Sequence, residues 1–408
     1  MFNQLSSRAL STLFMGDISS HEKLGKVKAY QLDQLLHFLR IWLNLPLVIF
    51  SFLFFSSPRN QDSTVFYDMA SANGIGSIRG KQPLFSFGVI SDVQYADIPD
   101  GRSFLGTPRY YRHSILVLKR AVQSWNNQQK LKFALNFGDI VDGFCPKDQS
   151  LGSIKKVVGE FDNFNGPVYH MIGNHCLYNL PRKELLPLLK IPKPDEGRAY
   201  YDFSPTPNFR FVVLDGYDIS AIGWPQDHPK SVEALEILSQ RNPNADKNSP
   251  SGLVGLERRY LMFNGGVGKE QLKWLDGILQ EATHLKQKVI VCCHLPLDPG
   301  ATSFAALLWN YDEVMDLIHN YNCVKVCLAG HNHTGGYAID SHGIHHRVLE
   351  AALECPPGRD AFGYVDVYDD GLCLTATDRM SSSKMLFDSD QTCDYENGCI
   401  TDSLTSTL

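Results

Sequence analysis

Side chains that can bind divalent metal ions follow five separate apolar runs of this sequence. Carboxylate and amide oxygens and imidazole nitrogens are the donors that proteins offer to such ions. A single aspartate after a strand is usually a turn or capping residue, but five such groups in one chain predict a metal-dependent site. The residues are Asp92 and Gln94 after 84–90, Asp139 after 132–137, Asn174 and His175 after 167–172, His294 after 288–293, and His331 and His333 after 324–329.

The apolar runs themselves have the character of buried β-strands. They are short and apolar throughout, which indicates strands covered on both faces, as in an α/β sheet. A further run of this kind spans 209–214, and amphipathic helices are predicted at 109–127, 154–161, 272–279 and 314–318. Because open α/β sheets carry their sites at the carboxyl ends of their strands, the metal-capable side chains are expected to meet there.

Two later stretches complete this prediction. Residues 345–354 and 362–378 have strand character, with a hairpin turn at Asp369-Asp370-Gly371, and supply material for a second sheet. Residues 217–268 contain several prolines and glycines and no clear period. A long irregular stretch inside a domain is usually functional, so we expect this one to cover a site.

The set of motifs Asp-x-Gln, Gly-Asp, Gly-Asn-His, His and Gly-His-x-His resembles that of the calcineurin-like metallophosphoesterases. The resemblance implies an α/β fold, a four-layer α/β/β/α sandwich of two mixed sheets. It also implies that His175 binds no metal and instead protonates the leaving group or stabilises charge on the phosphate. The ligands that it implies are Asp92, Gln94, Asp139 and His333 for one metal, and Asp139, Asn174, His294 and His331 for the second.

The chemistry of such a centre is coherent with these residue types. Two divalent ions roughly 3.5–4 Å apart can activate a shared water and clamp the phosphoryl oxygens during in-line attack. The bridging position needs a carboxylate, which Asp139 supplies. Gln94 offers an amide oxygen where the superfamily also uses histidine, and this harder donor favours Mn²⁺ or Mg²⁺ over Zn²⁺.

One segment separates this chain from the protein phosphatases of the superfamily. Those enzymes continue the Gly-Asp motif to an arginine that binds the phosphate, whereas here Gly143 and Phe144 follow Asp142. A bidentate arginine suits a terminal phosphate dianion, so its absence at this point disfavours monoester and phosphoprotein substrates.

A closer resemblance covers Leu84 to Met380. The segments FSFGVISDVQYAD, YYRHS, GDIVDG, FNGG, WNY and GHNHTGGY are similar to those of the manganese-dependent ADP-ribose/CDP-alcohol diphosphatases. This resemblance implies cleavage of the pyrophosphate of ADP-ribose and of CDP-alcohols such as CDP-choline and CDP-glycerol. The products are a nucleoside monophosphate and a phosphorylated alcohol or ribose. The cofactor implied is two divalent ions, Mn²⁺ in preference to Mg²⁺. Cys176 departs from the pattern, since an acidic residue usually follows the histidine there.

A nucleoside diphosphate substrate also needs a surface that holds its base and phosphates. Phe104, after the first motif, and Trp309, after His294, are the aromatic candidates, although core packing is the ordinary role of such residues. Asn264, with Gly265 and Gly266, is the candidate for contacts to a phosphate or sugar.

The predicted domain spans residues 83–380, preceded by an extension over 1–82 and followed by a loose tail over 381–408. Residues 41–55 are apolar, but the stretch is shorter than the ~20 residues of a membrane span and is interrupted by Asn44 and Pro46. The extension could be an upstream segment, a targeting region or a weak anchor; we predict a cytoplasmic protein. The tail is polar and without a period.

Composition narrows the class of protein further. The 408 residues carry a formal charge of −6, which argues against nucleic-acid binding. Ten cysteines without a Cys-x-x-Cys pair favour a reducing compartment. We expect a monomer that acts on small nucleoside diphosphate-linked molecules. The alternatives are another metallophosphodiesterase, acting on cyclic nucleotides or phospholipid head-group esters, and a non-catalytic scaffold of the same fold.

Overall fold

Every apolar run predicted to be a strand forms one. The structure, a computed structural model, describes residues 81–192 and 197–387. The first sheet has the order β14 (Ser383–Leu386), β13 (Gly371–Ala376), β12 (Gly363–Tyr368), β1 (Phe85–Ile90), β4 (Leu131–Asn136) and β5 (Val168–His170). The second has the order β10 (Gly336–Ile339), β11 (His345–Val348), β9 (Val324–Ala329), β8 (Lys288–Cys293), β7 (Phe209–Leu214) and β6 (Tyr201–Thr206).

Both sheets are mixed. In the first sheet β1, β4 and β5 are parallel, and β12 to β14 continue it as an antiparallel meander. In the second sheet β7, β8, β9 and β11 are parallel, while β6 and β10 pair antiparallel at its two edges. The parallel strands of each sheet therefore present their carboxyl ends at one edge.

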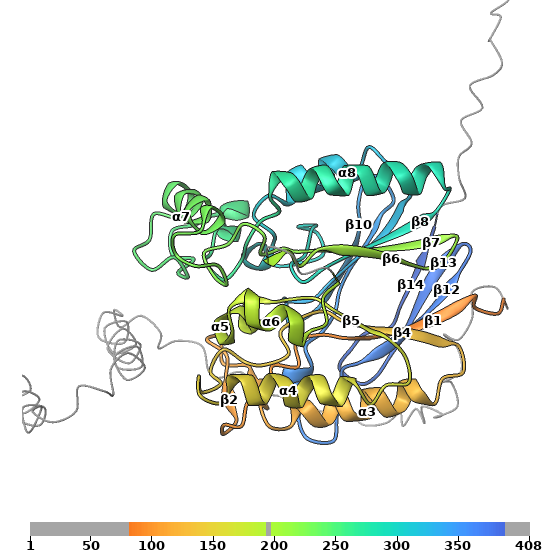
Figure 1. The fold of residues 1–408 in the computed structure, drawn as a ribbon, viewed down its shortest axis with the longest axis horizontal. Helices are drawn as coiled ribbons and strands as arrows, with labels where there is room; N and C mark the ends of the chain where they lie inside the picture. Colours follow the sequence, from red (N-terminus) through yellow and green to blue (C-terminus); the bar gives the residue numbers. More distant parts are fainter. Residues whose placement is uncertain (1–80, 193–196, 388–408) are drawn as a thin grey trace, which may run out of the picture. The chain divides into compact units, whose positions relative to one another are not determined.

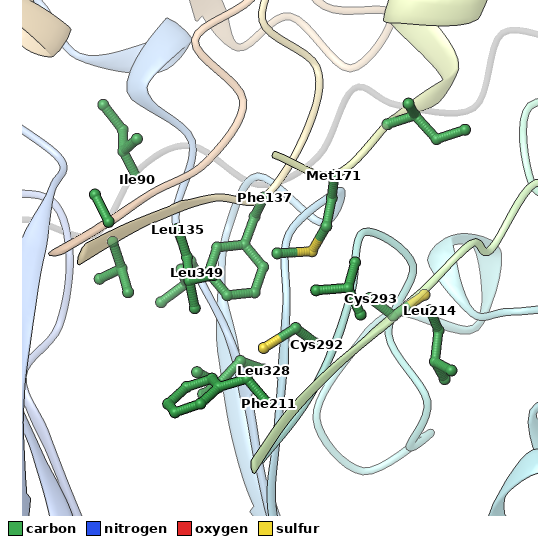
Figure 2. Close-up of a cluster of buried hydrophobic side chains, with 14 of the residues drawn as sticks. Ile90, Leu135, Phe137, Met171, Phe211, Leu214, Cys292, Cys293, Leu328 and Leu349 are labelled. Carbon is green, nitrogen blue, oxygen red and sulfur yellow. The ribbon is translucent and has the colours of Figure 1, made fainter. Parts of the chain in front are cut away.

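An aromatic core joins the faces of the two sheets. Phe87 of β1 and Phe133 of β4 both pack edge-on against Phe211 of β7, with ring centroids 5.1 and 5.2 Å apart. Closer to the carboxyl ends, Phe137 and Met171 lie with Cys292 among the buried side chains of this layer (Figure 2). The core thus extends from the middle of the strands to the edge that carries the predicted site.

Helices cover the outer face of each sheet (Figure 1). On the first sheet lie α3 (Ser114–Asn126) and α4 (Ser150–Phe161), and Trp125 of α3 packs so closely that a Cβ at Gly88 would lie 2.6 Å from its ring. On the second lie α8 (Lys269–His284) and α9 (Tyr311–Ile318), both in the predicted places. The four-layer α/β/β/α sandwich is confirmed.

Some local predictions were wrong. The helix predicted at 109–127 begins only at Ser114, because Pro108–Arg109 (β3) pairs with Gly101–Arg102 (β2) as a small hairpin. The segment 217–268 is not wholly irregular, because it contains α7 (Pro229–Arg241) and a 3₁₀ turn, η2 (Gly255–Arg259). Proline suggested a loop there, but Pro229 occupies the first helical turn, where its missing N–H costs nothing.

Four shorter elements complete the fold. They are α5 (Asn174–Asn179), α6 (Arg182–Leu188), η3 (Phe304–Ala306) and η4 (Ala352–Glu354). Helix α5 begins shortly after β5, and its first two residues, Asn174 and His175, belong to the predicted site.

The predicted boundary at residue 380 is too early. Strand β14 pairs antiparallel with β13, and Met385 is fully buried, so the folded part continues to at least Phe387. The predicted extension lies outside the described residues apart from its last two, and so does the tail from 388 onwards. Among the residues that are described, no helix is long and apolar enough to cross a membrane.

Candidate metal centre

The strand ends of the two sheets meet at one place. Asp139, which follows β4 of the first sheet, lies with His294 and His331, which follow β8 and β9 of the second, so that one ligand atom of each falls within 4.8 Å of the others. Asp139 Oδ2 is 3.3 Å from His294 Nε2. Residues far apart in sequence are therefore combined across the seam between the sheets, as the strand-end pattern predicts.

The turns that carry these residues are strained. Asp92, Gln94, Asp139 and His331 all have positive φ, between 41° and 65°. A side chain with a Cβ adopts this left-handed conformation at a cost of about 1–3 kcal/mol and does so most often at functional sites. Hydrogen bonds from the backbone stabilise this conformation. The N–H of Gln94 donates to the carbonyl of Asp139 at 2.8 Å, and the N–H of His331 donates to the side-chain oxygen Oδ2 of Asp92 at 3.1 Å.

Two glycines make room for the close approach. A Cβ at Gly173 would lie 2.1 Å from Asp139 Oδ1, and one at Gly138 would lie 2.7 Å from His294 Nδ1. Gly138 also has a φ of 98°, which favours glycine. These two contacts explain why glycine precedes the metal-capable residue in the Gly-Asp and Gly-Asn-His motifs.

Each of the three histidines is oriented through one ring nitrogen. His294 Nδ1 lies 2.5 Å from the carbonyl oxygen of Phe137, His331 Nε2 lies 2.9 Å from Asn264 Oδ1, and His333 Nδ1 lies 2.9 Å from Glu354 Oε1. The acceptors hold a proton on that nitrogen and turn the other nitrogen of each ring toward the site. This is the arrangement in which histidine binds a metal ion.

A second group of metal-capable side chains surrounds Asp92. His333 Nε2 is 3.5 Å from Asp92 Oδ1 and 2.9 Å from Gln94 Nε2, which is itself 3.3 Å from the same Asp92 oxygen. Gln94 Oε1 is buried and makes no hydrogen bond to any residue that the structure describes. A half rotation of the amide would turn this oxygen toward Asp92 and His333. The Asp-x-Gln motif is therefore buried in the site and is not an ordinary solvated turn.

The negative charges of the buried carboxylates favour a cation at this site. Burial alone would lower the pKa of His294, but the carboxylates of Asp139 and Asp92 outweigh it and raise this pKa to about 9. Burial would likewise lower the pKa of His333, which hydrogen bonds to Asp92 and Glu354 raise to about 9. Burial and the charge of His294 lower the pKa of His331 to about 3.

The donors at the site fit divalent metal ions. Two buried carboxylates remain ionised, because the histidine interactions outweigh burial and hold the pKa values of Asp92 and Asp139 below the usual range. Asp139 Oδ2 and His294 Nε2 are buried without a hydrogen bond to the described part of the chain. Ionised oxygens and imidazole lone pairs that converge without donors of their own are the expected state of a metal site.

Asn174 and His175 open helix α5 beside this group. The backbone N–H of His175 donates to Asp139 Oδ1 at 2.8 Å, which fixes the start of the helix against the bridging carboxylate. Asn174 is buried, and its Oδ1 accepts a hydrogen bond from the Tyr217 hydroxyl at 3.2 Å.

His175 is the more accessible of the two. Its Nδ1 accepts the backbone N–H of Gly143 at 2.8 Å and lies 3.3 Å from Asp142 Oδ2. The neutral ring therefore carries its proton on Nε2. Cys176 does not disturb this arrangement, because its side chain is fully buried and the carboxylate that faces His175 comes from Asp142.

An arginine that the sequence analysis missed lies nearby. Arg109, in β3, has NH1 3.8 Å from Asp142 Oδ2. A hairpin that is distant in sequence thus places a guanidinium beside Asp142. Glu354 was also missed, since neither residue belongs to a local motif.

Two of the three predicted substrate-binding side chains are not available for that role. Trp309 is 2% exposed, packs with Ile219 and Tyr260, and donates its indole N–H to the carbonyl of Leu261. The Asn264 side chain is fully buried: its amide N–H₂ donates to the carbonyls of Arg259 and Ala305, and its oxygen faces His331. It positions a histidine instead of facing a ligand.

Phe104 has the opposite environment. It lies between β2 and β3 and is 94% exposed. An exposed aromatic ring can stack on a base, and the structure therefore leaves this prediction open.

Replacing Glu354 with glutamine is expected to weaken metal binding by about 10–100-fold, since Glu354 orients His333 and increases its basicity. The midpoint of the Mn²⁺ dependence of hydrolysis should move to higher concentration, while the rate at saturating Mn²⁺ changes little. Glu270→Gln, on an exposed position of α8, is the matched control and should leave the midpoint in place. Equal midpoints for both variants would contradict the role of Glu354.

Comparison with known proteins supports these observations. A family model described as calcineurin-like phosphoesterase matches residues 85–335. A manganese-dependent ADP-ribose/CDP-alcohol diphosphatase of Arabidopsis thaliana is 70% identical over 303 residues, 74% of this chain and 97% of the relative. The protein of the same name from Oryza sativa subsp. japonica is 64% identical over 320 residues, 78% and 99% of the two chains.

More distant relatives agree in sequence and in structure. The Homo sapiens protein of that name is 40% identical over 313 residues, covering 73% of this chain and 91% of the relative. A crystal structure of a dimetal phosphatase from Danio rerio superposes with a TM-score of 0.72 at 38% identity, covering 75% of this chain and all of that one.

Proposed function

Because the chain belongs to the calcineurin-like phosphoesterases and, among them, to the manganese-dependent ADP-ribose/CDP-alcohol diphosphatases, we propose that it hydrolyses the pyrophosphate bond of ADP-ribose and CDP-alcohols. The products are a nucleoside monophosphate and a phosphorylated ribose or alcohol. The observation that carries the proposal is the convergence of Asp139, His294 and His331 across the seam of the two sheets.

The cofactor is a pair of divalent ions, with Mn²⁺ preferred. We assign Asp92, Gln94, Asp139 and His333 to one ion, and Asp139, Asn174, His294 and His331 to the other. When bound, such a pair lowers the pKa of a water molecule and neutralises charge on the phosphoryl oxygens. The ring nitrogens of the three histidines that face away from their polar partners, and the oxygens of Asp139 and Gln94 that have no hydrogen bond in the described part of the chain, support the assignment.

His175 acts on the leaving group. In the neutral ring Nδ1 accepts the N–H of Gly143; a second proton on Nδ1, beside Asp142, gives the imidazolium, which can donate its Nε2 proton to the departing phosphate oxygen. Asp142, 3.3 Å from Nδ1, stabilises the imidazolium before it donates, and the neutral ring left by the donation takes a proton back from water. In the folded protein burial would raise the pKa of Asp142, but the charge and hydrogen bond of His175 outweigh it and keep this carboxyl ionised.

The substrate end of the site combines a positive charge with an aromatic ring on the same hairpin. Arg109 supplies positive charge beside Asp142 and His175, from the hairpin that also carries Phe104. We propose that the nucleoside base stacks on Phe104 while its phosphates reach the metal centre. A hairpin that bears an exposed aromatic ring and a half-buried arginine suits a substrate with a base at one end and a diphosphate in its middle.

A hydrolysis panel tests this function directly. ADP-ribose, CDP-choline and CDP-glycerol should be cleaved faster with Mn²⁺ than p-nitrophenyl phosphate, cyclic nucleotides or a phosphoserine peptide. Faster turnover of cyclic nucleotides or head-group diesters would favour the alternative phosphodiesterase. A protein that binds two metals and cleaves none of the panel would be the non-catalytic scaffold.

Replacing Gln94 with histidine should shift metal preference away from Mn²⁺, because an imidazole nitrogen suits Co²⁺ and Zn²⁺ as well as the hard ions. The variant should bind Co²⁺ more tightly than the wild type in a direct titration, with little change in thermal stability. The measurement is the pair of binding curves, together with activity against each ion. Superimposable Mn²⁺, Mg²⁺ and Co²⁺ profiles would mean that Gln94 binds no metal.

We further propose that the protein acts as a monomer in the cytoplasm and binds no nucleic acid. The formal charge of −6 supports the last point, since nucleic-acid binders usually carry a basic excess. Sedimentation at assay concentrations tests the monomeric state. It is also the control for any count of metal ions bound per chain.

A further inference from the structure

A second group of metal-capable side chains lies at the other end of the second sheet. His319 follows the last turn of α9, and Asp340 and His342 lie in the turn between β10 and β11. One donor atom from each of the three falls within 4.8 Å of the others. His346, in β11, contacts the same carboxylate.

The carboxylate of Asp340 is held with one oxygen toward the histidines. Its Oδ1 accepts the backbone N–H groups of His342 (2.9 Å) and Ile344 (3.0 Å), which close the turn. Its Oδ2 lies 2.9 Å from His319 Nε2 and 3.1 Å from His346 Nε2. The backbone thus fixes the carboxylate, and the second oxygen faces two imidazole nitrogens.

His342 completes one side of the group. Its ring stacks on that of His319 with centroids 3.7 Å apart and 16° between the planes. Asp340 and His346 are largely buried, whereas His342 is exposed. An ion can therefore reach the group from solvent through the His342 side.

This group is remote from the proposed catalytic centre. Strand β9 begins after His319 and ends just before His331, so its six residues separate the two places. At a rise of about 3.3 Å per residue the separation is roughly 20 Å. A ligand at the second group would not touch the residues assigned to the diphosphatase reaction.

We propose that His319, Asp340 and His342 bind one Zn²⁺-like ion, with His346 orienting the Asp340 carboxylate. Two imidazoles and a carboxylate with a place for water are a donor set that Zn²⁺ accepts. Tetrahedral ligands about 2.0–2.1 Å from such an ion lie about 3.3 Å apart. The separation of His319 Nε2 from Asp340 Oδ2 is 2.9 Å, and the His342 ring must turn away from its stacked position on His319 to point a nitrogen at the same ion.

The ion would join the end of α9 to the β10–β11 turn, beside the edge strand of the second sheet. These two segments already contact each other through the His319–Asp340 hydrogen bond and the stacked rings of His319 and His342. The role of the ion is therefore structural, and the catalytic rate should not depend on it.

The test is a Zn²⁺ titration of the metal-free full-length protein against a chromophoric chelator. The wild type should bind one equivalent more than the double variant His319→Gln/His342→Gln. Glutamine keeps an N–H that can reach Asp340 and removes the imidazole. Zn²⁺ should also raise the thermal unfolding midpoint more in the wild type than in this variant.

Two further variants keep the test decisive. His342→Gln alone changes an exposed side chain, so it should fold, and it should weaken the additional equivalent at least tenfold. His284→Gln, at an exposed position in the last turn of α8, is the matched control and should bind as the wild type does. Equal numbers of Zn²⁺ equivalents in wild type and both His342 variants would overturn the proposal and leave the group as a hydrogen-bonded turn. If a variant loses the additional Zn²⁺ equivalent and keeps its rate of Mn²⁺-supported hydrolysis, the result supports a site that is separate from the catalytic one.

Discussion

Replacing Asp139 with asparagine is expected to lower turnover of ADP-ribose by at least about a thousandfold, a loss of about 4 kcal/mol of transition-state stabilisation. The variant should remain folded. Asparagine keeps an oxygen that can accept the backbone N–H of His175, which holds the start of α5. It removes the negative charge that faces His294 Nε2 and that two cations would share. Metal content after dialysis, circular dichroism and the hydrolysis rate are the three measurements.

Asp97 provides the control for this experiment. Its carboxylate is exposed and pairs with Arg112 on the surface, so Asp97→Asn should keep both metals and full activity. An Asp139→Asn protein that retains two metal equivalents and a normal rate would remove the basis for the bridging assignment.

The second large effect is expected at His175. His175→Gln should lower kcat for ADP-ribose by about 10²–10⁴-fold, the usual contribution of a general acid, without loss of metal. The loss should be much smaller for an artificial substrate with a p-nitrophenol leaving group, because that group departs without protonation. This contrast separates proton donation from a merely structural effect, which would lower both rates alike.

Asp142→Asn gives an independent measurement of the same assignment. It removes the carboxylate 3.3 Å from His175 Nδ1 that stabilises the imidazolium, and should lower kcat for ADP-ribose more than for the p-nitrophenyl substrate. A similar fall in rate for both kinds of substrate in His175→Gln would assign His175 to charge stabilisation and not to proton donation.

The part of this site that sequence predicts is the part carried by strand ends. Asp139 and His294 each follow a buried apolar strand directly, so a rule about parallel sheets suffices to bring them together. The polar partners of the histidines follow no such rule. Glu354 lies in a short 3₁₀ turn and Arg109 in a two-residue strand, and both reach the site only through tertiary packing.

The errors have a common physical cause. Asn264 and Trp309 were assigned to substrate because they occur in polar or strand-end segments, yet Trp309 is buried in the small core beneath α7 and the Asn264 side chain is buried against Arg259, Ala305 and His331. Helix α7 itself buries only Ser231, Ala234 and Leu238, small or widely spaced side chains that leave a weak periodic signal. Sequence reveals the residue types, whereas burial decides whether a side chain faces a ligand or a neighbour.

The position of β1 has a consequence for how the chain reaches its native state. This strand lies in the middle of its sheet, between β4 and β12, and its contact between Ser86 and Asp366 joins residues 280 positions apart. On the ribosome, the side of β1 that β12 will cover stays open while some 230 residues beyond β4 are synthesised. Contacts of such long range slow folding, and an open strand edge invites pairing with other chains. Nascent chains should therefore gain hydrolytic activity only after β12 has emerged, and chaperone binding before that point should raise the yield of active protein.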